Sequence, residues 1–254
     1  MSLTFDEYEY DEEAILEPAM LVSPVLGFPL FGVSCFSKKL HDAILKKYGG
    51  EPIQRFFTED GGVPIYKVDY KGQDVLLYMS RVGAPAAAIQ MEEAYAMGLR
   101  KLIVMGSCGT LDGTIEFGKL IIPTSGIRDE GTSYHYFPAW QEMVTPPSVV
   151  EVIKQELEKR ECSYVCGKTW TTDGLYRETV QKTLLRKKQG CIVVEMEYTA
   201  MQAVATYRGM DFGQILYSED NLDANAWENR GYLPKNREKS NILLDLAFEC
   251  VLKI

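Results

Sequence analysis

The sequence predicts an α/β fold in a single domain, and three observations support this prediction. Apolar runs of strand length alternate with helix-like segments along nearly the whole chain, which is the pattern of a sheet covered by helices on both faces. The 254 residues, 46% of them hydrophobic and 25% charged, are enough to bury one sizeable core. Neither a low-complexity linker nor an internal repeat divides the chain.

Eight segments are expected to be strands because each is a short apolar run bounded by turn residues. In chain order they cover residues 30–36, 64–70, 75–80, 101–106, 119–123, 164–169, 192–196 and 212–218. Helix-like patterns lie chiefly at residues 84–97, 148–159, 179–188, 198–207 and 238–252. The stretch 126–147, with Trp140 and three prolines, is expected to be a long loop that covers or builds a site.

The charge pattern argues against nucleic-acid binding. The formal net charge is -9, but seven acidic residues with no basic residue among them lie between residues 6 and 17, so the rest of the chain is close to neutral. A nucleic-acid partner would require a basic face to neutralise its phosphates. We interpret residues 1–20 as an acidic arm that is solvated or contacts another subunit, and residues 21–254 as the single folded domain.

Cysteine and histidine usage predicts a reduced protein without a metal site. The six cysteines are scattered, and Cys162 and Cys166 have no second Cys/His pair that would complete a four-ligand zinc site. Of the two histidines, His41 falls in an amphipathic stretch where a solvated helix position is expected. No apolar run approaches the roughly 20 residues that span a bilayer, and the N-terminus is acidic where a signal peptide is basic. We therefore predict a cytoplasmic protein that binds no membrane.

Two glycine-containing turns follow predicted strands. One, Arg81-Val-Gly-Ala-Pro85, leads from a strand into a helix, and the other is Gly106-Ser-Cys-Gly109. Both place backbone N–H groups at the carboxyl ends of strands, where open α/β sheets bind anions and other ligands. A tight turn without a ligand is the alternative interpretation of each motif.

Two carboxylates flank a methionine in Glu195-Met-Glu197, at the end of a predicted strand. If strand geometry extends through the motif, Glu195 and Glu197 share one face. Two like charges beside a core are unfavourable unless something binds them, and adjacent hydroxyls, as on a ribose, would provide the compensation. Alternatively, Glu197 begins the following helix, where an acid suits the helix dipole.

Together these motifs resemble the purine nucleoside and uridine phosphorylase superfamily. The two glycine turns, the segment 128–138, Glu195-Met-Glu197 and Glu219-Asp220 occur in the order found there, across roughly residues 30–250. The resemblance implies a three-layer α/β/α fold with a central mixed, barrel-like sheet, and an enzyme that cleaves the C1′–N bond of a nucleoside. Segment 128–138 is more similar to uridine phosphorylases than to hexameric purine enzymes, and segment 170–179 is similar to a less characterised branch.

The resemblance also implies roles for individual residues. The Met-Glu pair that holds the sugar corresponds to Met196 and Glu197, with Glu195 beside them, and the residue between phosphate and sugar corresponds to Ser107. Asp220 matches the acid that contacts the base, with Glu219 as a rival, and we expect Asp220 and Glu197 to be catalytic. The residues expected to bind the base are Cys108, Gly109, Leu175, Tyr176, Arg177 and Asp220, with Glu178 available for its polar edge.

The expected phosphate site departs most from the superfamily. The superfamily's N-terminal phosphate loop, Gly-Asp-x-x-Arg, is represented here by residues 34–38, which end in Lys38. Val104 replaces an arginine that is common in relatives. Arg81 stands where relatives commonly have a small residue, and we expect its guanidinium to reach a phosphate bound over the backbone of Gly83. An ordinary ion pair is the alternative for Arg81. The predicted phosphate ligands are Arg81, Gly83, Ser107 and Lys38.

Three functions of different classes remain open on the sequence. The first is a nucleoside phosphorylase, with uridine-like substrates slightly favoured, phosphate as co-substrate and no cofactor. The second is a nucleoside N-ribohydrolase that uses water, and the third is a non-catalytic nucleoside-binding protein. The resemblance further implies a homo-oligomer, a dimer or a trimer of dimers, in which Arg55, Tyr8 or Tyr10 completes the neighbour's site in place of an absent N-terminal histidine.

Overall fold

The structure, a computed structural model, describes residues 8–9, 14–57, 59, 61–223, 227–229 and 239–254. Within these ranges eleven strands form one mixed sheet, in the order β11-β10-β6-β8-β9-β5-β1-β4-β3-β2, with β7 paired to β6. Strand β10 also pairs with β5, so five strands form a closed cycle of pairings in the order β5, β10, β6, β8 and β9. The strands are β1 (Phe31–Cys35), β2 (Glu51–Phe56), β3 (Val63–Tyr70), β4 (Gln73–Met79), β5 (Lys101–Thr110), β6 (Leu120–Asp129), β7 (Met143–Val144), β8 (Tyr164–Thr172), β9 (Cys191–Glu195), β10 (Asp211–Asn221) and β11 (Glu228–Asn229).

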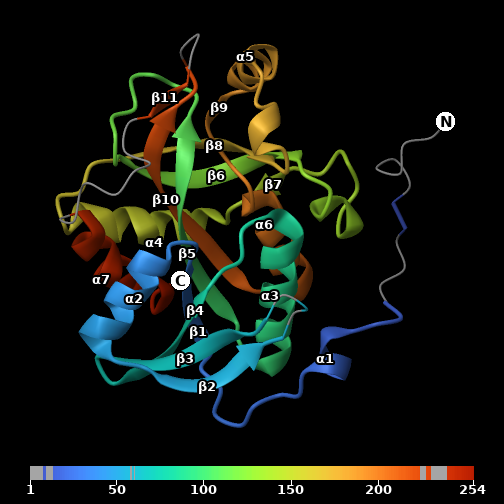
Figure 1. Cartoon of the computed structure of the whole chain (residues 1–254), viewed down its shortest axis with the longest axis vertical. Helices are drawn as coiled ribbons and strands as arrows, with labels where there is room; N and C mark the ends of the chain where they lie inside the picture. The colour runs from blue at the N-terminus through green and yellow to red at the C-terminus, as the bar shows by residue number, and fades with distance from the viewer. Residues whose placement is uncertain (1–7, 10–13, 58, 60, 224–226, 230–238) are drawn as a thin grey trace.

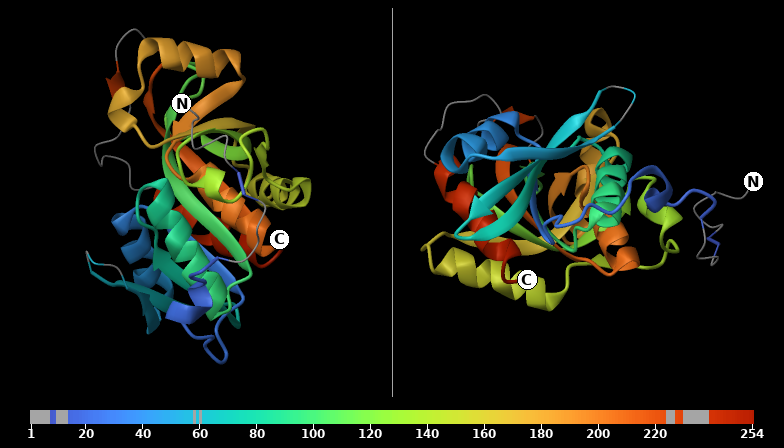
Figure 2. Two further views of the ribbon diagram at one scale, coloured as in Figure 1. Left: turned by 90° about the vertical axis from the view of Figure 1, so that its right-hand side faces the viewer. Right: turned by 90° about the horizontal axis from the view of Figure 1, so that it is seen from below.

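Helices cover both faces of the sheet, which gives the expected three layers (Figures 1 and 2). On one face α2, α4 and α7 contribute to a core with β1 and β5, and on the other α3 and α6 contribute to a second core. The helices are α1 (Pro18–Leu21), α2 (Lys38–Tyr48), α3 (Ala84–Met97), α4 (Pro147–Glu158), α5 (Val180–Lys188), α6 (Tyr198–Arg208) and α7 (Lys239–Val251). Two short 3-10 turns, η2 (Ser133–His135) and η3 (Leu175–Arg177), lie in loops.

Local sequence explains where the helices begin and end. Helix α3 starts after Gly83, has a proline in its first turn and ends at Gly98, which has a positive φ of 137°. Ser37 and Thr179 cap α2 and α5 by accepting a backbone N–H with their side chains. No helix among these described segments is both long enough and apolar enough to cross a membrane.

All eight predicted strands are present, and four of them extend three or more residues past their predicted ends. Strands β5, β6, β8 and β10 continue beyond their apolar runs into polar residues such as Ser107, Arg128, Thr172 and Glu219. Hydrophobic patterning ends where the side chains become polar, so it cannot reveal these extensions. Strand β2 was not predicted because it is an edge strand in which only Phe56 is fully buried.

The expected solvated position of His41 is wrong. Its side chain is buried on α2 and its ring packs at a tilt against Tyr66, 5.6 Å away between centroids. Burial lowers the pKa of this imidazole, against the opposing contact with Asp42.

The expected long loop is partly regular structure. Strand β6 extends to Asp129, and residues 133–135 and 143–144 form η2 and β7. The Arg128 guanidinium holds the remainder by donating hydrogen bonds to Ser133 Oγ and to the carbonyls of Phe137, Pro138 and Gln141. Arg128 therefore fixes a loop rather than a ligand.

Candidate active site

The two glycine turns lie at the same edge of the sheet because the parallel strands that they follow end together. Strands β4, β1 and β5 are neighbours, and Cys35 pairs with both Met79 and Met105. The amide of Ser80 donates to the Cys35 carbonyl at 2.9 Å, and the hydroxyls of Ser34 and Ser80 are 2.7 Å apart. The turn 80–83 and Gly106 therefore lie at the same edge of the sheet, at the carboxyl ends of these strands and separated by β1.

Glu197 joins the first turn to β9. Its Oε1 accepts a hydrogen bond from the Gly83 amide at 2.7 Å, although the two residues are 114 positions apart in the chain. The side chain is only 6% exposed. Burial, with the neighbouring charge of Glu195, raises the pKa of Glu197 to about 8.

Glu195 has a different environment. Strand β9 ends at this residue, so strand geometry does not extend to Glu197, which instead occupies the N-cap of α6. The Oε1 of Glu195 accepts from the hydroxyls of Thr171 and Thr169 at 2.6 and 3.3 Å, and its Oε2 accepts from the amides of Glu197 and Tyr198 at 2.8 and 2.6 Å. Both oxygens thus have partners within the protein, which orient the start of α6.

The second turn lies between the strands that hold the two groups of acids. Gly109 pairs with Asp220 on β10 and with Val194 on β9. An added Cβ at Gly109 would lie 3.0 Å from Asp220 Oδ1 and 3.1 Å from Val194 Cγ1. This close packing explains the glycine. It also brings the Asp220 carboxylate to the same end of the sheet as Glu195.

Asp220 is held by a residue that the sequence did not single out. The indole Nε1 of Trp227 donates to Asp220 Oδ2 at 2.8 Å. The neighbouring Glu219 carboxylate is half-buried, and burial raises its pKa against the hydrogen bond from Ser107. Ser107 is exposed on β5 beside Cys108, whose buried thiol has a pKa raised well above its ordinary value. Cys108 is therefore a packing group rather than a nucleophile.

The remaining candidates for base binding lie on and just after η3. Leu175, Tyr176 and Arg177 are exposed, and Tyr176 is 94% accessible. Glu178 follows them and is half-buried, and burial together with the charge of Asp220 raises its pKa to about 7. The charge of Asp220 thus acts on Glu178, which follows the three exposed residues.

The two basic side chains that are predicted to bind phosphate already have partners within the protein. Lys38 is exposed at the start of α2 and pairs with Asp42 at 2.5 Å. The Arg81 guanidinium donates to the Gly61 carbonyl at 2.6 Å in the β2–β3 hairpin, and its amide donates to Gln90 Oε1 at 2.8 Å. The Arg81 guanidinium is thus bound to the hairpin, and Lys38 faces solvent.

Comparison with known proteins identifies the family. The model of the phosphorylase superfamily matches residues 31–249.

The chain belongs to the phosphorylase superfamily.

Individual relatives are distant. The chain is 26% identical over 160 residues to a guanosine phosphorylase of Halorubrum lacusprofundi, a match that covers 63% of this chain and 66% of that protein, slightly less than two thirds. The structure of a uridine phosphorylase from Vibrio fischeri superimposes with a TM-score of 0.79 at 21% identity, covering 95% and 100% of the two chains. An AMP nucleosidase from Bacteroides thetaiotaomicron gives 0.71 at 20% identity, with 89% of each chain covered. At these identities the structural likeness establishes the fold.

Sequence reasoning missed the groups that position the site of this superfamily member. Thr169 and Thr171 alternate along β8 with both side chains directed to Glu195, and the hydroxyl of Thr199 donates to Glu130 at 2.9 Å. Alternating threonines in a strand that ends near an acidic motif were the available signal. The contact between Trp227 and Asp220 had no such signal, because it depends on the β10–β11 pairing.

Proposed function

We propose that this chain is a nucleoside phosphorylase that cleaves the C1′–N bond of a nucleoside with phosphate. The observation that carries the proposal is the hydrogen bond between Glu197 and Gly83, which joins the expected sugar carboxylate to the expected anion turn. A nucleoside and a phosphate that share a reacting carbon must bind next to each other, and this contact supports proposing adjacent sites for the two.

The proposed reaction replaces one bond to C1′ by another. The C1′–N bond breaks and its electron pair stays on the base nitrogen, while a phosphate oxygen forms a bond to C1′. The products are the free base and ribose or deoxyribose 1-phosphate. Because the sugar becomes oxocarbenium-like on the way, a carboxylate that holds the ribose hydroxyls and an anion near C1′ both stabilise the transition state.

We assign Glu197 and Met196 to the sugar, and Asp220 to the base. Glu195 is retained near the ribose as a positioning residue, because its oxygens already accept four hydrogen bonds. Asp220, held by Trp227, would share or supply the proton that the departing base requires. Cys108, Gly109, Leu175, Tyr176 and Arg177 stay as proposed base contacts, and Glu178 joins them because of its position near Asp220.

The anion subsite is proposed over the turn 80–83, with Arg81 and Gly83 as its ligands and Ser107 between phosphate and sugar. Lys38 would have to leave Asp42 to take part. Phosphate is the co-substrate in this proposal, and no cofactor is required. We further propose a cytoplasmic location, with which six free cysteines are compatible.

A panel of nucleosides tests this proposal directly. Uridine, guanosine, inosine and adenosine are incubated with the enzyme, with and without inorganic phosphate, and the released base and sugar product are measured. Uridine is the substrate that we slightly favour. Release of base that saturates with phosphate, with formation of a sugar 1-phosphate, would support a phosphorylase.

A nucleoside N-ribohydrolase is the second candidate, because specific contacts favour it. Lys38 is paired with Asp42, and by the resemblance Val104 stands where relatives commonly carry an arginine. Water as nucleophile needs a carboxylate base and no cationic pocket. Base release that does not depend on phosphate and yields free ribose would favour the hydrolase. Binding of a nucleoside without release of its base would favour the third candidate, a non-catalytic nucleoside-binding protein.

A further inference from the structure

The Gly83 amide is the group on which two parts of the site converge. Gly83 is the N-cap residue of α3, a helix of 14 residues whose first turn contains no acidic side chain of its own. A helix N-terminus favours a negative charge, and here that charge comes from Glu197 on a different element. An added Cβ at Gly83 would meet no atom within 4 Å, so the turn borders open space on that side.

We propose that Glu197 competes with the incoming anion for the Gly83 amide, so that the anion binds tightly only after a ribose has engaged Glu197 or after Glu197 has taken up a proton. This inference rests on the proposed function, because it takes Gly83 as part of the anion subsite. A single N–H cannot donate a full hydrogen bond to a carboxylate and to a phosphate at once. Two anions that both approach one amide also repel each other.

The charges around Glu197 strengthen the competition. Glu195 on β9 and Asp173 at the end of β8 both add to the unfavourable negative potential at Glu197. Glu130 is tied to the same helix through the Thr199 hydroxyl. Arg81, two residues before Gly83, is the cation of the turn, and its Nη2 donates to Gly61. A second anion therefore meets the charges of Glu195 and Asp173 besides that of Glu197, and one nearby guanidinium.

The ribose relieves this competition in a simple way. Two sugar hydroxyls can donate to the Glu197 carboxylate, which compensates its charge and lets it release the Gly83 amide. The amide and the N-terminus of α3 are then available to the phosphate. The consequence is positive coupling between the two substrates, in which each binds better when the other is present.

Sulfate binding to the free enzyme tests the inference, because sulfate stays a dianion between pH 6 and 9 whereas phosphate titrates. Sulfate affinity is measured by isothermal titration calorimetry across this range for the wild type, Glu197→Gln and a control, Glu93→Gln. Glu93 is also a buried carboxylate with a raised pKa, but lies ten residues further along α3, about 15 Å from Gly83. Glu197→Ala serves as a second variant if circular dichroism shows that the first is not folded.

The expected result is a wild-type affinity that falls by about tenfold or more from pH 6.5 to 9, because Glu197 becomes charged over this interval. Glu197→Gln should bind sulfate more tightly than the wild type at pH 9 and depend much less on pH, and Glu93→Gln should follow the wild type. Equal, measurable binding by the wild type and Glu197→Gln at every pH would overturn the inference.

Failure of the inference and failure of the proposed function remain distinguishable. If sulfate binds neither protein at any pH, there is no anion subsite over Gly83 and the inference is wrong. Phosphate-dependent release of base in the nucleoside panel would still establish a phosphorylase with its anion held elsewhere. If sulfate binds neither protein and base release is also independent of phosphate, the inference and the proposed function are both wrong.

Discussion

Glu195 and Glu197 are separated by one residue and differ in what satisfies them. Glu195 accepts two backbone amides and two threonine hydroxyls, which partly offset the rise that burial causes in its pKa. Glu197 accepts the Gly83 amide, and burial beside Glu195 makes its ionised form unfavourable. A group that the fold satisfies so poorly is the one available to a ligand.

Replacing Glu197 by Gln should keep the fold and sharply lower turnover of any nucleoside substrate. A carboxylate that accepts two ribose hydroxyls would become an amide with one accepting oxygen, and we expect a loss of about 2–4 kcal/mol in transition-state stabilisation. The measurement is kcat/KM, with Glu93→Gln as the matched control. Near-wild-type activity of Glu197→Gln would remove this residue from the sugar site.

The same variant gives a stability readout with a defined sign. The pKa of Glu197 is raised to about 8 in the folded protein, so between its ordinary pKa and pH 8 the folded state holds a proton that the unfolded chain has lost. The contribution of this residue to stability therefore decreases as pH rises through that window. The Tm of the wild type should fall relative to that of Glu197→Gln between pH 5 and pH 8, and a constant difference would contradict the raised pKa.

At the scale of elements, the turn between β4 and α3 connects the proposed anion subsite to the hairpin of β2 and β3. Arg81 spans this junction through its contact with Gly61. Replacing Arg81 by Ala should weaken the dependence on phosphate far more than nucleoside binding, because a dianion needs a fixed cation and a neutral nucleoside does not. The apparent KM for phosphate and for nucleoside should be compared. Equal changes in both would assign Arg81 to the hairpin rather than to the anion.

How far the sequence predicts each element depends on what its residues show. Helix α3 was predicted with its observed bounds because glycine and proline mark its ends. The extensions of β5, β6, β8 and β10 and the edge strand β2 were not, since their exposed or polar side chains give no apolar period.

For the site, motif order placed the glycine turns and the acids at one end of the sheet. The partners Thr171, Trp227 and Gly83 could not be assigned, because each contact joins residues on separate elements.

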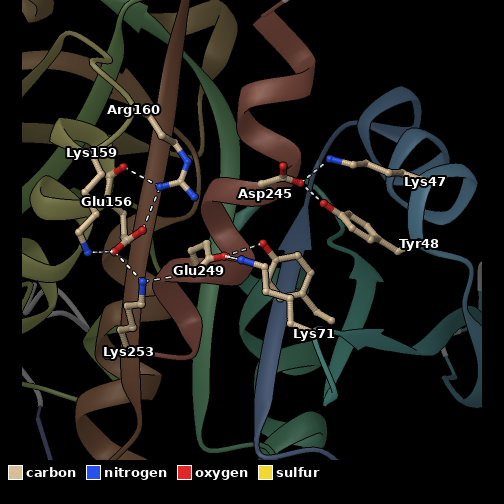
Figure 3. Close-up of polar contacts among 10 residues, drawn as sticks. Lys47, Tyr48, Lys71, Glu156, Lys159, Arg160, Asp245, Glu249 and Lys253 are labelled. Carbon is tan, nitrogen blue, oxygen red and sulfur yellow. Dashed lines mark hydrogen bonds and ion pairs between the residues drawn. The ribbon is translucent and has the colours of Figure 1, made fainter.

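At the scale of the whole molecule, a charge network around the buried Glu156 joins the end of α4 to the end of α7 (Figure 3). The Glu156 carboxylate, 3% exposed, accepts from Lys159, Lys253 and Arg160 at 2.6, 2.7 and 2.9 Å. Burial acts to raise its pKa, but these three cations outweigh burial and lower it to about 2. Glu249, also bound to Lys253, has its pKa lowered to about 2, first of all by Lys71.

This network predicts how the protein responds to acid. A carboxylate with a lowered pKa stabilises the fold above its ordinary pKa, and this contribution is lost as pH falls toward 2. Glu156→Gln should cost about 2 kcal/mol of unfolding free energy at pH 7, and the difference from the wild type should shrink below pH 4. Urea denaturation measures both, with the exposed Glu151→Gln on the same helix as control. A loss that is the same at pH 7 and pH 3 would contradict this account.

Subunit assembly stays a prediction at this scale. We expect a homo-oligomer with a dimer as its smallest unit, since exposed apolar side chains such as Leu16, Met20 and Leu26 gather in the N-terminal segment. Arg55 is exposed on β2, Tyr8 donates to the Tyr136 carbonyl of its own chain, and Tyr10 lies outside the described residues. Light scattering at micromolar concentration should give at least a dimer. An active monomer under the same conditions would refute shared sites.

The central claim is that phosphate attacks the sugar of a nucleoside at the junction of Glu197 and the turn 80–83. The most direct test is the fate of the sugar when the full-length enzyme is given a nucleoside that it cleaves, with increasing inorganic phosphate. The account predicts that base release saturates with phosphate and that the sugar appears as its 1-phosphate. Base release that is indifferent to phosphate, with free ribose as the product, would contradict it.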